Sequence, residues 1–434
     1  MTLRKTTTPP MGWNSWDCYG TTVTEAEVLA NAEFMAEHLL PYGWDTIVID
    51  ADWADPAPRT HGYNDEAALN IDAFGRLQPD PERFPSAAGG RGFAPLAERV
   101  HALGLTLGVH VMRGIPRVAV TAATPIAGSD ETAADIADET NRCEWNPHYV
   151  GLDHGRAGAQ AYYDSCVAQF AEWGIDFIKA DDLLWPYQAA DIEAYSRAIA
   201  RADRDIALSL SPGRDLSAAH LEHLRENSTM WRVCDDVWDR WEDIEPNFAR
   251  LARWAPLAGP GGWPDADMLP LGRIGIRAER GEPRDDRLTP AERRSLLTLW
   301  VMARSPLMIG GDLPSSDPAT IALYTNDEVL RILRDSTGNR ELLRERDLVV
   351  WAAESGDTRW AAIFDLSGDA RDESFDTRSI GFGSAPGSVS DVWSGESVPV
   401  EAVAVQSNAA RSVAPGSSVV RVALEPHGCV LLRA

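Results

Sequence analysis

The sequence predicts an α/β protein: a (β/α)8 TIM barrel over residues 1–335, followed by a C-terminal antiparallel β-sandwich domain over 336–434. Two observations support this fold class. Apolar strand-like runs alternate with amphipathic helices about eight times in the first part of the chain, which is the pattern of a parallel barrel. After Gly338 short strand-like runs are separated by turn residues, which is typical of an antiparallel sandwich.

The expected elements follow one another in a regular order. After a short extended segment at 9–16, the expected strands are 44–50, 105–112, 174–182, 206–211, 229–236, 259–268 and 307–312. The expected helices are 24–40, 93–103, 158–173, 191–202, 216–225, 242–254 and 290–303. Thr24 and Glu27 have the spacing of a capping box, which marks where the first helix begins. In the C-terminal domain the expected strands are 347–353, 359–365, 389–392, 419–423 and 429–432.

One segment breaks the alternation. Residues from about 113 to about 155 are expected to form a long loop, which includes Arg113 and Arg117. Loops of that length inside a compact domain are usually functional.

Composition limits the expected partners. The 434 residues carry a net charge of −26, which disfavours nucleic acid and anionic membranes and favours a neutral or cationic ligand. No apolar run is long enough to span a membrane, and the N-terminus lacks the apolar core of a signal peptide, so the expected location is cytoplasmic. The five cysteines are scattered and include no Cys-x-x-Cys pair, which predicts reduced thiols rather than disulfides or a zinc site.

The stretch 174–182 is the first candidate for a functional site. Its apolar residues suit a buried parallel strand, and charged residues follow them. Lys179 and Asp181 stand at spacing i, i+2, which places both side chains on one face of a strand. A cation beside a carboxylate at the C-terminal end of a barrel strand is typical of an active site, although a strand-end salt bridge is the structural alternative.

Carboxylates also follow other expected strands. Arg232, Cys234 and Asp236 share one face if their strand runs straight, which pairs Arg232 with Asp236. The remaining acidic residues at strand ends are Asp50, Asp52, Asp182, Asp235, Asp265, Asp267 and Asp312. Two carboxylates that flank one pocket are what glycoside hydrolysis needs, because one attacks the anomeric carbon while the other protonates the leaving oxygen.

Other chemistries fit the sequence less well. The nine histidines include no His-x-His pair of the kind that an amidohydrolase-type metal site needs. The strand-end carboxylates leave open a Mg²⁺ site like those of enolase-type barrels. The run Gly89-Gly-Arg-Gly92 predicts a plain loop because it does not lie between a strand and a helix, and no nucleophile elbow marks a catalytic serine.

Six motifs occur in order along nearly the whole chain. They are Pro9-Pro-Met-Gly-Trp-Asn-Ser-Trp16, Ile49-Asp50, Gly75-Arg-Leu-Gln-Pro-Asp-Pro-Glu-Arg-Phe84-Pro, Lys179-x-Asp181, Trp231-Arg232-x3-Asp236 and Gly259-Pro-Gly-Gly-Trp-Pro-Asp-x-Asp267-Met. Together they resemble the motifs of glycoside hydrolase family 27, the α-galactosidase or melibiase group of clan D. The resemblance implies a barrel with a C-terminal β domain, and a retaining mechanism without a metal or an organic cofactor.

The resemblance implies a catalytic role for two carboxylates. Asp181 falls on the family's nucleophile, and Asp236 falls on its general acid/base. For this chemistry Asp181 must be ionised, which the nearby Lys179 would favour, whereas Asp236 must start protonated. The two carboxylates of a retaining enzyme lie roughly 5–5.5 Å apart.

Sugar-binding residues carry over from the family one at a time. Trp16 falls on the tryptophan that lines the sugar pocket, and Asp50 falls on the first of two paired aspartates that bind sugar hydroxyls. Lys179 and Arg232 fall on hydroxyl-binding cations, and Asp267 falls on a pocket carboxylate.

Three further substrate-binding candidates lie where the chain departs from the family pattern. Ala51 replaces the second paired aspartate, and Asp52, which would share a face with Asp50 by alternation, is its candidate substitute. His110 stands where the family has a tyrosine. Ser211 stands where the family has a glutamate near the 2-position of the sugar. The family's disulfide cysteines are also absent.

The leading hypothesis is a retaining, exo-acting α-galactosidase-like hydrolase of small oligosaccharides or glycosides. The nearest alternative is the same chemistry on a β-L-arabinopyranoside, an α-N-acetylgalactosaminide or an isomaltose-type α-glucoside, which the changes at Ala51 and Ser211 motivate. The remote alternative is a non-catalytic sugar-binding protein. The expected partner is therefore a carbohydrate, with no nucleic acid and no membrane, and the sequence is compatible with a monomer or a homo-oligomer.

Overall fold

The computed structural model describes residues 3–383, 386–402 and 418–434, and the chain forms two compact units. The first unit consists of Met1–Asp236, Pro260–Asp286 and Leu307–Thr320. The second consists of Val237–Gly259, Arg287–Pro306 and Ile321–Ala434. The domain boundary that the sequence predicts after residue 335 stays a prediction.

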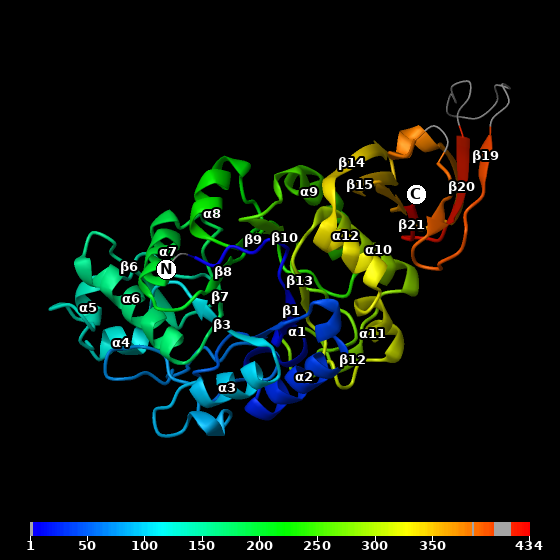
Figure 1. The fold of residues 1–434 in the computed structure, drawn as a ribbon. Helices are drawn as coiled ribbons and strands as arrows, with labels where there is room; N and C mark the ends of the chain where they lie inside the picture. Colours follow the sequence, from blue (N-terminus) through cyan, green and yellow to red (C-terminus); the bar gives the residue numbers. More distant parts are fainter. Residues whose placement is uncertain (1–2, 384–385, 403–417) are drawn as a thin grey trace. The chain divides into compact units, whose positions relative to one another are not determined.

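The first unit contains the barrel that the sequence predicts. Its strands are β1 (Met11–Asn14), β2 (Thr46–Ile49), β3 (Thr106–Met112), β7 (Phe177–Asp181), β8 (Ala207–Leu210), β9 (Met230–Arg232), β10 (Trp263–Asp265) and β13 (Leu307–Ile309). Neighbouring strands pair in parallel, in the order β10-β9-β8-β7-β3-β2-β1-β13 (Figure 1). A parallel bridge between Leu269 and Ile309 joins the two ends of this sheet and closes the barrel. The predicted fold class is confirmed.

Helices connect these strands at the expected places. In the first unit they include α2 (Glu25–His38), α3 (Ala94–Ala102), α6 (Ala157–Glu172), α7 (Ala189–Arg201) and α8 (Leu221–Asn227). The predicted capping box is present: the Thr24 hydroxyl accepts a hydrogen bond from the amide of Glu27, whose carboxylate accepts one from the amide of Thr24. None of the helices in the described parts of the chain is long and apolar enough to cross a membrane.

The segment 113–155 is not the plain loop that the sequence predicts. It contains a small antiparallel sheet in the order β4-β6-β5, and two short helices. The elements are β4 (Ile115–Pro116), α4 (Arg117–Thr121), α5 (Ala133–Ile136), β5 (Ala137–Asp138) and β6 (Tyr149–Leu152). These strands are two to four residues long, too short to give a periodic pattern in the sequence.

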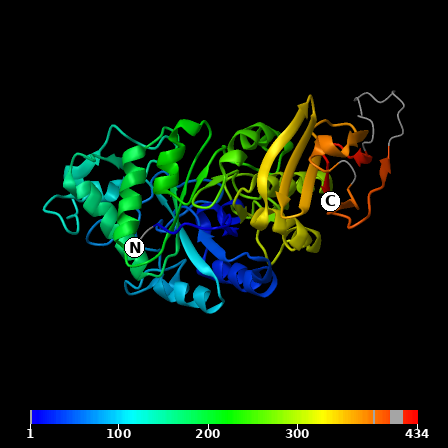
Figure 2. The same ribbon diagram turned by 45° about the horizontal axis from the view of Figure 1, so that its top comes forward.

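The second unit contains the β domain. Its main sheet has the order β14-β15-β16-β21-β18, and a second sheet has the order β17-β20-β19. Figure 2 shows the strands of this part of the chain in yellow to red. Both sheets contribute apolar residues to one buried core, as expected of a sandwich. The strands are β14 (Thr337–Glu345), β15 (Leu348–Ser355), β16 (Thr358–Asp365), β17 (Arg371–Asp376), β18 (Ser390–Asp391), β19 (Val400–Ala402), β20 (Ser418–Leu424) and β21 (Cys429–Arg433). The helices α9 (Trp241–Trp254), α10 (Pro290–Ala303) and α12 (Asp327–Asp335) also belong to this unit.

Candidate active site

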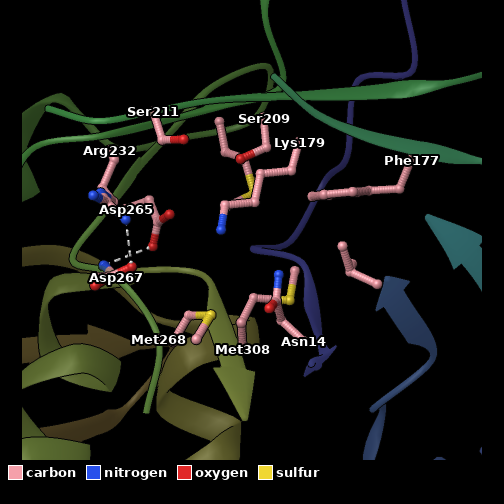
Figure 3. Close-up of a pocket in the computed structure, with 12 residues that line it drawn as sticks. Asn14, Phe177, Lys179, Ser209, Ser211, Arg232, Asp265, Asp267, Met268 and Met308 are labelled. Atoms are coloured by element: carbon pink, nitrogen blue, oxygen red, sulfur yellow. Dashed lines mark hydrogen bonds and ion pairs between the residues drawn. The ribbon is translucent and has the colours of Figure 1, made fainter. Parts of the chain in front are cut away.

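A cavity lies among the barrel strands of the first unit. Its lining residues are Asn14, Val48, Phe177, Lys179, Ser209, Ser211, Met230, Arg232, Asp265, Asp267, Met268 and Met308. Figure 3 shows Lys179 extending into this space. Arg232, Asp265 and Asp267 lie on one side of it, and Asn14 lies on another. The wall is therefore apolar in part, with a few convergent charged groups, as in small-molecule sites.

Asp181, the predicted nucleophile, is the last residue of β7 and is held by hydrogen bonds to both carboxylate oxygens. Its Oδ1 accepts from the Ser211 hydroxyl at 2.8 Å and from the amide of Asp182 at 2.9 Å. Its Oδ2 lies 3.3 Å from His110 Nε2. Burial alone would raise the pKa of this carboxyl, but the hydrogen bond from His110 and the charges of Lys179 and Arg232 outweigh burial and hold the pKa well below its usual range.

Lys179 and Asp50 form a buried ion pair at the floor of the site. Lys179 Nζ donates to Asp50 Oδ2 at 2.7 Å, and Asn14 Nδ2 donates to the same oxygen at 2.7 Å. Burial opposes ionisation of Asp50. The charges of Lys179 and His110 and the hydrogen bonds from Lys179 and Asn14 together outweigh burial, so the pKa of Asp50 is lowered. Burial also opposes the charge on Lys179, yet the attraction of Asp50 and Asp181 raises its pKa. Both groups are therefore charged at neutral pH.

Arg232, which also lines the cavity, joins two carboxylates. Its Nη1 donates to Asp267 Oδ1 at 2.9 Å, and its Nη2 donates to Asp236 Oδ1 at 2.5 Å. The pairing of Arg232 with Asp236 is thus as predicted, but the reason differs, because β9 ends at Arg232 and the strand alternation does not reach Asp236. The Asp236 side chain is 37% exposed, whereas that of Asp181 is 16% exposed, so the two carboxylates have different access to solvent.

Trp16 and Asp52 lie at the mouth of the barrel, in segments that follow β1 and β2. The Trp16 ring packs against Tyr63, with centroids 5.7 Å apart. Asp52 does not continue the alternation from Asp50, because β2 ends at Ile49 and the backbone of Asp52 turns into the left-handed region with φ of 61°. Its carboxylate lies 3.5 Å from His148 Nδ1, and its role in substrate binding stays a prediction.

Several residues of the site were not among the sequence candidates. Asn14 lies inside one of the recognised motifs, so a motif signal existed for it. Asp265 was recognised as an acidic residue at a strand end, within another motif, but was given no role in binding. Burial, with the negative charge of Asp267 added, raises the pKa of Asp265 to about 7. Tyr63 comes from a polar loop without any pattern. Its ring packs against Trp16 and His148, and burial, with the negative charges of Asp52, Asp181 and Asp50 added, raises its pKa.

The arrangement can supply acid, base and nucleophile from carboxylates alone. Two cations, Lys179 and Arg232, line the cavity and are available to bind hydroxyl groups. The ionised carboxylate of Asp181 follows Lys179 on β7, and the more exposed carboxyl of Asp236 is bonded to Arg232. Among the described residues, no group of three or more His, Cys, Asp or Glu side chains is arranged to hold a metal ion.

Comparisons with known proteins agree with this chemistry. A family model described as alpha galactosidase A matches residues 8–155 and 152–335. The structure of a family 27 β-L-arabinopyranosidase from Geobacillus stearothermophilus is 42% identical and superposes with a TM-score of 0.92, covering 98% of this chain and 96% of that chain. An α-galactosidase from Cyamopsis tetragonoloba is 27% identical over 367 residues, which cover 82% of this chain and 72% of that protein.

A third relative extends the range of sugars. The α-N-acetylgalactosaminidase of Gallus gallus is 29% identical over 351 residues, covering 78% of this chain and 73% of that protein. With the barrel, its carboxylates and these matches together, the chain is a glycoside hydrolase of the α-galactosidase-like class. It belongs to glycoside hydrolase family 27, the alpha galactosidase A or melibiase family.

Proposed function

We propose that the protein is a retaining, exo-acting glycosidase that prefers β-L-arabinopyranosides, with Asp181 as nucleophile and Asp236 as general acid/base. In the first step a carboxylate oxygen of Asp181 bonds to the anomeric carbon. The bond between the anomeric carbon and the aglycone oxygen breaks, and its electron pair stays on that oxygen. Asp236 donates a proton to the same oxygen. In the second step Asp236 takes a proton from water, whose oxygen bonds to the anomeric carbon and releases Asp181.

The low pKa of Asp181 supports its assignment as nucleophile. A nucleophilic carboxylate must be ionised, and the hydrogen bond from His110 together with the charges of Lys179 and Arg232 favours that state. The greater exposure of Asp236 supports its assignment as acid/base, because water must reach this residue in the second step.

The observation that carries the choice of sugar is Ala51. Family 27 enzymes hold sugar hydroxyls with two adjacent aspartates, whereas here Asp50 is followed by a buried methyl group. β-L-arabinopyranose has the ring configuration of α-D-galactopyranose but lacks the hydroxymethyl group, and therefore one hydroxyl. A site with one carboxylate fewer matches a sugar with one hydroxyl fewer. The same sugar class is named for the Geobacillus stearothermophilus enzyme, of which a variant was solved with arabinose.

Ser211 favours a second candidate, an α-N-acetylgalactosaminidase. Its side chain is smaller than the glutamate that the family carries at this position, near the 2-position of the sugar, where an N-acetyl group needs space. Against this candidate, the Ser211 hydroxyl already bonds to Asp181.

The cytoplasmic location and the oligomeric state stay predictions. The five free cysteines favour a reducing compartment.

The test is hydrolysis of 4-nitrophenyl glycosides that differ only in the sugar. We expect kcat/KM for the β-L-arabinopyranoside to exceed that for the α-D-galactoside by at least about 10-fold, since a single group in a fitted pocket is worth roughly 10–200-fold. The α-N-acetylgalactosaminide and the α-D-glucoside should be cleaved more slowly still. A preference for the α-N-acetylgalactosaminide would establish the second candidate, and a preference for the α-D-galactoside would reject the role of Ala51.

Replacing Ala51 by Asp tests that role directly. Restoring the second carboxylate should raise the ratio of α-D-galactoside to β-L-arabinopyranoside kcat/KM by about 10-fold, because the added oxygens can accept a hydrogen bond that only galactose can donate. The matched control is Ala51→Val, which adds volume without a carboxylate and should leave the ratio unchanged or lower it. Equal ratios in Ala51→Asp and the wild type would show that this position does not select the sugar.

A further inference from the structure

Arg113 is a buried cation in direct contact with the backbone around the predicted nucleophile. It follows β3 and begins the 113–155 segment, and its side chain is 3% exposed. Its Nε donates to the carbonyl oxygen of Asp182 at 2.9 Å and lies 2.8 Å from Asp182 Oδ2. Its backbone amide donates to the carbonyl oxygen of Asp181 at 3.1 Å. Arg113 thus bonds to the carbonyl group of Asp181, the last residue of β7, and to that of Asp182, the residue after it.

The backbone at Asp182 has an uncommon conformation. Its φ is 60°, in the left-handed region that residues other than glycine adopt rarely, with Asn and Asp the best tolerated. In this conformation the amide of Asp182 donates to Asp181 Oδ1 at 2.9 Å. A backbone turn that is not favoured by itself needs support from its surroundings, and Arg113 provides that support.

We propose that the Arg113–Asp182 ion pair positions the carboxylate of Asp181 for attack. The pair holds the turn at Asp182, the turn aims the Asp182 amide at Asp181 Oδ1, and this amide fixes the carboxylate plane together with Ser211. Arg113 and Asp182 are positioning residues, since both act through Asp181. The inference rests on the proposed role of Asp181 as the nucleophile.

The local sequence explains why this chain needs such a support. All five cysteines are free, so no disulfide holds the chain after the nucleophile. The Asp182 carboxyl is faced by Arg113, by Asp181 and by the thiol of Cys143 from the 113–155 segment. Burial raises the pKa of Asp182 to about 7, while Arg113 opposes the rise, so the pair can be ionised at neutral pH.

A purely structural role must be separated from a positioning role. Removing only Arg113 leaves the Asp182 carboxyl buried without its partner, which destabilises any protein. Replacing both partners with neutral residues of similar size removes that penalty and is often neutral for stability. Arg113→Met combined with Asp182→Asn therefore keeps the fold but loses the contact, and Asn still tolerates the left-handed backbone.

The experiment compares Arg113→Met, the double variant and the wild type by thermal unfolding and by kinetics per active site. Active sites are counted with a fluorinated glycosyl fluoride of the preferred sugar, whose covalent product with the enzyme hydrolyses slowly. We expect the double variant to regain most of the melting temperature that Arg113→Met loses. Its kcat and its rate of labelling should stay roughly 10- to 100-fold below the wild type with little change in KM, because a small misplacement of a reacting group costs that much.

Two results would overturn the inference: recovery of kcat together with melting temperature in the double variant, or a wild-type rate in Arg113→Met. The matched control is Arg117→Gln, in the same segment: this exposed side chain donates to the carbonyl oxygen of Pro147 at 3.1 Å, and its replacement should leave every quantity unchanged. Mass spectrometry of the labelled wild type tests the role of Asp181 as nucleophile separately from the role of Arg113. A label on any residue other than Asp181 contradicts the proposed function itself, before Arg113 is considered.

Discussion

Asp181→Asn is expected to lower kcat by about 10⁴-fold or more, because the neutral amide cannot form the covalent bond to the anomeric carbon. The substitution keeps the shape of the side chain, and its oxygen can still accept hydrogen bonds from Ser211 and from the amide of Asp182. The measurement is kcat on 4-nitrophenyl β-L-arabinopyranoside, with circular dichroism and thermal unfolding to show that the variant folds.

The depressed pKa of Asp181 also predicts how stability and activity depend on pH. Because its pKa is depressed in the folded protein, the carboxylate stabilises the fold above the usual aspartate pKa of about 3.9, and this contribution disappears as the pH falls toward the lower folded value. The nucleophile should therefore remain ionised throughout the working range of the enzyme. In the wild type, kcat/KM should fall below neutral pH as Asp182, with a pKa of about 7, loses its charge and its pairing with Arg113. In the Arg113→Met/Asp182→Asn variant, which lacks this pair, ionisation of Asp181 should not limit kcat/KM down to about pH 4. An Asp181→Asn variant with more than about one per cent of wild-type activity contradicts the assignment.

Periodicity was sufficient to predict the barrel and the residues at its strand ends. The buried strands β2 and β7 carry Asp50 and Asp181 at their ends because parallel strands place their C-terminal residues at one mouth. The alternation of side chains along a strand no longer holds just beyond the ends of β2 and β7. Asp52 and Asp182 both adopt positive φ, which reverses the side-chain direction that alternation assumes.

Contacts that depend on loops could not be predicted from the sequence. Tyr63 reaches Trp16, and His148 reaches Asp52, from segments whose polar composition has no period. Arg113 was visible as a charged residue in a long segment, but its contact with Asp182 joins residues 69 positions apart. In the second unit β14 was missed for a related reason: most of its residues are exposed or half-buried, so it lacks the apolar pattern of an inner strand.

Asp236→Ala is expected to separate the two chemical steps. For an alkyl β-L-arabinopyranoside, whose leaving oxygen needs a proton, kcat/KM should fall by about 10²–10⁴-fold. For the 2,4-dinitrophenyl glycoside, whose leaving group is stable as an anion, the first step should be almost unaffected. The second step still needs a base, so the covalent intermediate should accumulate and produce a burst of dinitrophenolate.

Azide makes the assignment specific, because it attacks the anomeric carbon without needing a base. With Asp236→Ala it should restore kcat on the dinitrophenyl substrate and yield β-L-arabinopyranosyl azide of retained configuration. The matched control is Asp235→Asn, one residue earlier, whose side chain is 57% exposed and lies 3.7 Å from Arg214. Its Oδ1 also accepts a hydrogen bond from the amide of Asp236 at 3.2 Å, a bond that the oxygen of Asn can still accept. Neither of these two contacts involves Arg232, so the control should show neither a burst nor azide rescue. Rescue with inverted configuration would mean that Asp236 occupies the position of the nucleophile and that the two roles are exchanged.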